Sequence, residues 1–114
     1  MDQLKAIEAF AALAQDTRMS IYRLLVKQAE NSLRASDISD RLNIVPSTLS
    51  GHLAILKRAG LLRATRHQRE IHYAADIEAM NELISFLLQD CCDGKMDNCG
   101  EILTLLKKPE RQNV

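Results

Sequence analysis

The fold of this chain is decided by the stretch VPSTLSGHLAILKRAGLL at positions 45–62. Pro46 is suited to a helix start, because the amide proton it lacks would be unpaired in the first turn. Leucine recurs three and four positions apart, at Leu49, Leu53 and Leu56. This is the spacing of one buried helix face. Because Gly60 is the residue type that ends helices in left-handed geometry, we expect a helix from Pro46 to about Ala59.

A shorter helix precedes this one. Ile38 and Leu42 lie four positions apart, so they form its buried side. Ser36 is a good capping residue, and we expect it to start this helix at positions 37–42. Asn43 then marks a brief turn before the longer helix.

The periodicity changes after Gly60. Residues 61–65 and 70–74 read as two short strands around a basic tip at positions 66–69. The tip contains no Asn-Gly type turn, so we expect it to be longer than two residues or mobile. Short helix, turn, long helix and hairpin is the order of a winged helix-turn-helix.

Three further helices complete the expected architecture. Apolar spacing predicts a first helix at positions 4–14, a central second helix that starts after Asp16 or Thr17, and a fifth helix that starts at Asp76. We therefore expect a mainly α fold with a small β-hairpin wing, in one domain at positions 1–114. Its DNA-reading part is expected at 34–74.

Charge is unevenly distributed although the net charge is 0. Between Arg41 and His72 six basic residues face one acidic residue, a local charge of +5, whereas positions 73–114 carry eight acidic and four basic residues, or −4. Local basic density attracts phosphates. This asymmetry favours a nucleic-acid partner for the middle of the chain.

The second helix of a helix-turn-helix enters the major groove through its N-terminal residues. The candidates for base contacts are Ser47, Thr48, Ser50, Gly51 and His52. The candidates for phosphate contacts are Lys57, Arg58, Arg66 and Arg69. Simpler interpretations exist: Ser47 as a first-turn polar residue, His52 as a packing residue, and the wing arginines as a solvated turn.

These residues resemble the ArsR/SmtB family of repressors. The long helix matches the family pattern P-S-T-L-S-x-H-L-x-x-L-x-x-A-G-L, and residues 12–18 resemble the entry L-x-D-x-T-R to the second helix. The resemblance implies a homodimer that represses transcription until an inducer binds. Gly51 departs from it, since many relatives carry a large or basic residue there.

The number of apolar residues in the first and last helices suggests dimerisation independently of the family resemblance. Leu4, Ile7 and Phe10, the fifth helix and the segment 102–106 cannot all be buried in so small a monomer. We therefore expect dimerisation helices at about 4–14 and 76–106.

All three cysteines lie close together, at Cys91, Cys92 and Cys99. The inducer sites of many family members, a Cys-x-Cys pair in the third helix or Asp and His on the fifth, are missing. Three thiolates without a fourth good donor suit a soft centre. As(III), or Sb(III), is therefore the expected inducer, and the cluster resembles that of arsenic-responsive repressors with a C-terminal Cys-Cys…Cys site.

Other interpretations of this thiol cluster stay open. Asp93 and Asp97 could add an oxygen ligand for zinc, cadmium or lead, and the nearby carboxylates favour a divalent cation over neutral arsenite. A redox switch would pair Cys99 with one neighbour, because a bridge between adjacent cysteines is strained. The cysteines could also be inert packing residues.

The sequence contains no sign of an enzyme or a membrane protein. It has no nucleophile motif, no glycine-rich phosphate loop and no histidine near the cysteines. No apolar run approaches the ~20 residues of a membrane span, and no secretory signal is evident, so we expect a cytoplasmic protein.

Overall fold

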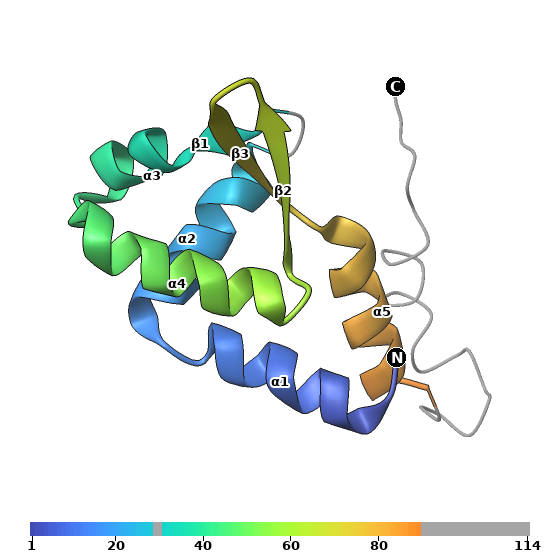
Figure 1. The fold of residues 1–114 in the computed structure, drawn as a ribbon. Coiled ribbons are helices and arrows are strands. Elements are labelled where there is room, and N and C mark those ends of the chain that lie inside the picture. The colour runs from blue at the N-terminus through green and yellow to red at the C-terminus, as the bar shows by residue number, and fades with distance from the viewer. Residues whose placement is uncertain (29–30, 90–114) are drawn as a thin grey trace.

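The computed structural model describes residues 1–28 and 31–89. Two helices, α1 (Gln3–Leu13) and α2 (Asp16–Lys27), lead into a short strand β1 (Leu33–Arg34). The helix pair α3 (Ala35–Leu42) and α4 (Pro46–Arg58) follows, then the hairpin β2 (Leu62–His67) and β3 (Glu70–Ala75), and finally α5 (Ile77–Leu87). The hairpin rises beside α3 and α4, and α5 lies next to α1 (Figure 1). This is the expected winged helix-turn-helix.

One core joins the helices to the base of the wing. The leucine stripe of α4 is buried throughout, as the spacing predicts, together with Ile21 and Leu25 of α2, Ile38 of α3 and Leu83 of α5. The side of α1 that faces this core is lined by alanine, at Ala6, Ala9 and Ala12. Small side chains let α1 approach closely, and they leave Leu4, Ile7 and Phe10 on the outside.

The wing differs from the expected hairpin in two ways. The sheet has three strands in the order β1-β3-β2, because Leu33 pairs with Tyr73 and Arg34 with His72. The turn is also shorter than expected: His67 pairs with Glu70, so only Gln68 and Arg69 connect the strands. Gln68 takes the left-handed conformation, φ 59°, that such a turn more often assigns to glycine or asparagine.

Two helix starts also differ from the expected ones. Ser36 does not cap α3: the helix begins at Ala35 with Arg34 as its N-cap residue, and the Asp37 carboxylate accepts the Arg34 amide proton at 3.1 Å. In α2, Asp16 is already helical and Gln15 is the cap residue, accepting the Arg18 amide proton at 2.8 Å.

The ends of α3, α4 and α5 follow the expected local chemistry. Asn43 is left-handed at φ 57° and ends α3, and Gly60 is left-handed at φ 84° just after α4. Asp76 caps α5 by accepting the Ala79 amide proton. Within the two described ranges, no helix has the length and apolar character of a membrane span.

Candidate nucleic-acid interface

The beginning of α4 presents small polar residues to solvent. The leucine stripe turns one face of α4 inward, which leaves Ser47, Thr48, Ser50 and Gly51 exposed. Hydroxyl groups hydrogen-bond to base edges or phosphates, and the threonine methyl matches the methyl of thymine. Pro46 stands in the first turn, as expected. The structure thus brings these four candidates together on one exposed part of α4.

His52 differs from these candidates because it is half-buried. Its Nδ1 lies 3.4 Å from a guanidinium nitrogen of Arg18, which belongs to α2. The imidazole is therefore in contact with a residue of another helix. In the sequence, Arg18 stands out only as part of a family pattern, which assigns it no role.

Lys57 and Arg58 are exposed in the last turn of α4. Positive charge at this end also complements the negative end of the helix dipole, so helix stability alone would favour these residues. Their exposure leaves them available to phosphates as well.

The wing holds its basic residues at the hairpin tip. Arg69 is exposed within the turn itself, and Arg66 is exposed at the end of β2. The Arg66 Nε donates to the Gln68 carbonyl at 3.2 Å, so this side chain folds over the turn. The other guanidinium nitrogens of Arg66 have no protein partner among residues 1–28 and 31–89.

Arg34 joins the helix-turn-helix to the wing, and sequence reasoning assigned it no role either. Its guanidinium donates to both Asp37 oxygens, at 3.2 and 3.0 Å, and to Glu70 at 3.1 Å. These bonds lower the pKa of the Asp37 and Glu70 carboxyl groups. The spacing of Arg34 and Asp37 is a visible local signal, but the partner on β3 lies 36 positions away. The bridge links the tip of the wing to the start of α3.

The thiol cluster Cys91, Cys92 and Cys99 lies outside the described residues. Within the described part of the chain, no group of three or more His, Cys, Asp or Glu side chains is placed to hold a metal ion.

Comparison with known proteins gives the same assignment as the fold. Residues 13–65 match the family model of a helix-turn-helix domain. An uncharacterised helix-turn-helix transcriptional regulator of Bacillus subtilis, YbzH, is 32% identical over 74% of this chain and 96% of its own. The transcriptional activator HlyU of Vibrio cholerae is also 32% identical, over 70% of this chain and 74% of its own.

Solved structures resemble the whole fold. An ArsR-like regulator from Rhodococcus superposes with a TM-score of 0.70 over 93% of this chain and 95% of its own, at 24% identity. The homodimeric winged helix-turn-helix domain of a Mycobacterium bovis regulator gives a TM-score of 0.59 over 75% and 80%, also at 24% identity. Fold, matched domain and relatives agree: this chain belongs to the ArsR/SmtB family of winged helix-turn-helix transcriptional regulators, which are DNA-binding proteins and not enzymes.

Proposed function

We propose that this protein is a homodimeric repressor in the cytoplasm, which holds operator DNA until As(III) or Sb(III) binds Cys91, Cys92 and Cys99. The observation that carries the DNA-binding part is the exposure of Ser47, Thr48 and Ser50 at the start of α4. Their side chains suit base edges, and the basic groups of the wing and of the α4 C-terminus suit the phosphates on either side.

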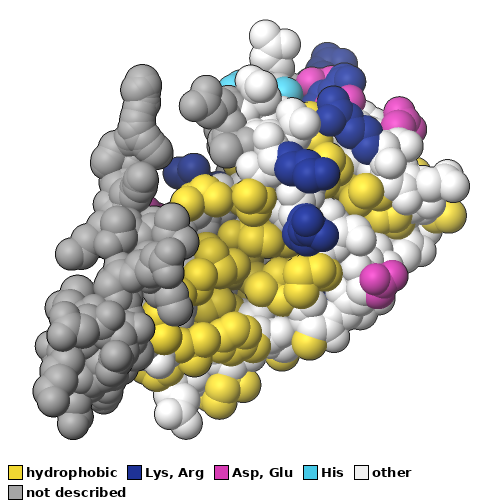
Figure 2. All heavy atoms as spheres, turned by 180° about the vertical axis from the view of Figure 1, so that it is seen from behind, with side chains coloured by type: hydrophobic (Ala, Val, Ile, Leu, Met, Phe, Trp, Pro, Cys, Tyr) yellow, Lys and Arg dark blue, Asp and Glu magenta, His cyan; other side chains and the backbone are white. Residues whose placement is uncertain are grey.

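The dimer is supported by an apolar surface on α1 and α5. Leu4 is 68% exposed, Ile7 54% and Phe10 40%, and on α5 Leu87 is 58% exposed. Figure 2, a view from behind, shows apolar side chains gathered over the side of the molecule where these helices lie. Exposed apolar patches of this kind mark protein interfaces. A second copy of the chain is the proposed occupant, and one neighbour in fold is itself homodimeric.

The choice of As(III) depends on ligand chemistry. Three thiolates satisfy a trivalent, thiophilic centre, and they leave no fourth donor for a tetrahedral ion. The competing proposal is a divalent ion, zinc, cadmium or lead, with Asp93 or Asp97 as the additional ligand. A thiol redox signal at Cys99 is the third candidate.

Release from DNA separates these inducers. A duplex selected by the protein from a random-sequence pool would serve as the operator probe, with binding followed by fluorescence anisotropy. We expect arsenite and antimonite to release it, and zinc, cadmium, lead and peroxide to do so only at much higher concentration. Release by zinc or cadmium at equal concentration would favour the divalent site, and release by peroxide would favour the redox switch.

The apoprotein provides the control for the sign of regulation. A repressor of this kind binds the duplex without inducer. The relative HlyU, in contrast, is named a transcriptional activator. If the duplex is bound only after arsenite is added, the repressor proposal is wrong. Serine in place of Cys99 should leave apo binding unchanged and weaken the arsenite response. A full response would point to a site of two thiols, Cys91 and Cys92.

A further inference from the structure

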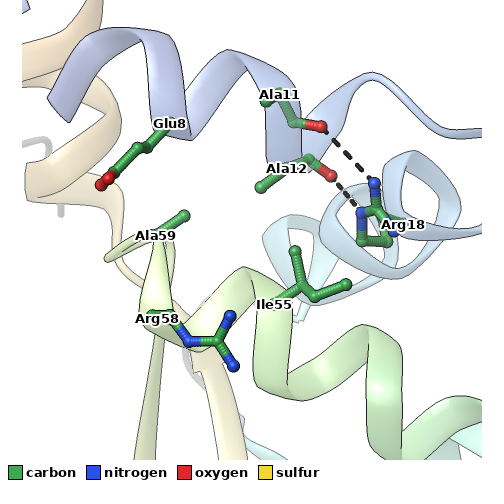
Figure 3. A pocket seen from close by; sticks show the side chains of 7 residues that line it. All are labelled: Glu8, Ala11, Ala12, Arg18, Ile55, Arg58 and Ala59. Carbon is green, nitrogen blue, oxygen red and sulfur yellow. Dashed lines mark hydrogen bonds between the residues drawn. The ribbon is translucent and has the colours of Figure 1, made fainter. Parts of the chain in front are cut away.

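Arg18 makes contacts to two different helices from the first turn of α2. Its Nε donates to the Ala12 carbonyl at 2.6 Å, and one terminal nitrogen, Nη2, donates to the Ala11 carbonyl at 3.5 Å. The other terminal nitrogen, Nη1, lies 3.4 Å from His52 Nδ1 in α4. Figure 3 shows Arg18 directed at the end of α1, with its bonds to the Ala11 and Ala12 carbonyls drawn as dashed lines.

The contacts to α1 are those that a helix end requires. Ala11 and Ala12 lie within the last turn of α1, where helix carbonyl groups run out of amide partners. The Ala11 carbonyl accepts the Ala14 amide proton at 3.2 Å, and the Ala12 carbonyl accepts its hydrogen bond from Arg18. A guanidinium supplies the donors, and its charge complements the negative end of the helix dipole. Arg18 therefore caps the C-terminal end of α1.

A hydrogen bond at the contact to α4 selects one tautomer of His52. A guanidinium has only donors, so Nδ1 of His52 has to be the acceptor. The ring proton then resides on Nε2. This leaves a donor on the nitrogen that faces away from Arg18, and His52 follows Thr48 by four positions on the same side of α4.

Direct packing between α1 and α4 is incomplete at this point. A pocket of about 290 Å³ lies between the two helices, lined by side chains that include Glu8, Ile55 and Arg58 (Figure 3). Apolar contact does not fill this space, so the polar link through Arg18 adds to the buried alanine face of α1 in setting the position of α4 relative to α1.

We propose that Arg18 is a positioning residue for DNA binding. It links the end of α1 to His52, and it thereby holds both the recognition helix α4 in place and His52 in its Nε2–H form. The inference goes beyond the proposed repressor, and it rests only on α4 being the helix that contacts DNA. It requires neither arsenite nor a particular oligomeric state.

A double-mutant cycle tests the link, with binding to the selected duplex as the measurement. We expect Arg18→Gln to weaken binding about tenfold, and His52→Ala to do the same. In the His52→Ala background, Arg18→Gln should lower the affinity for the duplex less than about twofold, because the partner through which Arg18 acts is gone. If the two losses multiply instead, Arg18 does not act through His52 and the proposal is overturned.

A matched control is available on the same helix. Arg23 is an exposed arginine of α2, and Arg23→Gln should leave DNA binding within about twofold of wild type. Arg18→Lys keeps the positive charge at the end of α1 but lacks the planar guanidinium group with its several N–H donors. We expect it to retain the unfolding midpoint better than Arg18→Gln while still losing the His52-dependent part of DNA affinity. If the glutamine variant does not fold, the lysine variant takes its place in the cycle.

Long-range nitrogen–proton NMR of the histidine rings at pH 8 gives a readout that needs no DNA. The wild-type His52 ring should be a single Nε2–H tautomer with Nδ1 as acceptor, and Arg18→Gln should mix the tautomers. A proton on Nδ1 in the wild type would overturn the proposal. If the protein fails to bind duplex DNA, the proposed function fails, but the tautomer still decides the link between Arg18 and His52.

Discussion

Substitution by alanine should change the stability of the fold in opposite directions at two glycines of the recognition helix α4 and its end. Gly51 lies within α4, whereas Gly60 follows the end of α4 in the left-handed conformation, φ 84°. A Cβ atom at either position would meet no atom within 4 Å apart from those of its immediate backbone surroundings. Sterics are therefore equal at the two sites, and only the backbone conformation differs.

The expected magnitudes follow from that difference. Glycine inside a helix is about 0.5–1 kcal/mol less favourable than alanine, so Gly51→Ala should stabilise the fold by about that amount. A left-handed conformation costs an L-residue about 1–2 kcal/mol, so Gly60→Ala should destabilise it by a similar amount. The corresponding shifts in melting temperature are about +2 to +6 °C and about −4 to −12 °C.

Urea unfolding followed by helical circular dichroism measures both changes. The titrations need several protein concentrations, because the stability of a dimer depends on concentration. If Gly51→Ala fails to raise the midpoint, or if Gly60→Ala leaves it unchanged, the backbone argument is refuted.

The same Gly51 variant also reports on DNA. Gly51 follows Ser47 by four positions, so the two share a face of α4. If this face enters the groove, the added methyl group should lower DNA affinity although it stabilises the protein. Unchanged affinity would place Gly51 outside the contact surface.

Three further predictions concern the wing, the core and the dimer. Arg69→Ala should weaken binding to all duplex sequences and reduce the salt slope by about one unit, as the loss of one phosphate contact does; an unchanged slope would remove the wing tip from the interface. Tyr22 is buried, its hydroxyl has no partner within the described residues, and burial, with a smaller effect of Asp76, raises its pKa to about 12. Since an unfolded tyrosine ionises near pH 10, folding stability should fall from pH 10 upward, and Tyr22→Phe should remove this loss and be neutral or stabilising at pH 7. Phe10→Glu should give a monomer by light scattering without unfolding the chain, and a persistent dimer would move the interface away from α1.

The buried helices could be predicted from the sequence because their signals are local. The leucine stripe of α4 repeats every three or four residues, and Gly60 and Asp76 are the residue types that helix ends select. The structure confirms each of these. The wing was predictable as a hairpin but not in detail, since Gln68 is an unusual residue for a left-handed turn position and β1 is two residues long.

The contacts that join separate elements could not be predicted in the same way. Arg34 reaches Glu70 across 36 positions, and Arg18 reaches His52 across 34. Nothing periodic in the sequence records such a pair. The expected cap at Ser36 was wrong for the same reason, because Arg34 and Asp37 start α3 as part of a bridge to the wing.

The anchoring of α4 restricts how an inducer could release DNA. Leu49, Leu53 and Leu56 are each at most 4% exposed, and burying one such side chain stabilises the fold by about 1.5–3 kcal/mol. Coupling between two ligand sites is usually about 1–3 kcal/mol in total. Moving α4 out of its own core would therefore cost more than an inducer supplies. In the proposed dimer, release has to come from a change between the subunits, which alters the spacing of two recognition helices that each stay fixed in their subunit. The Arg18 link to α1 serves this arrangement, because it makes α4 follow the helix that forms the proposed interface.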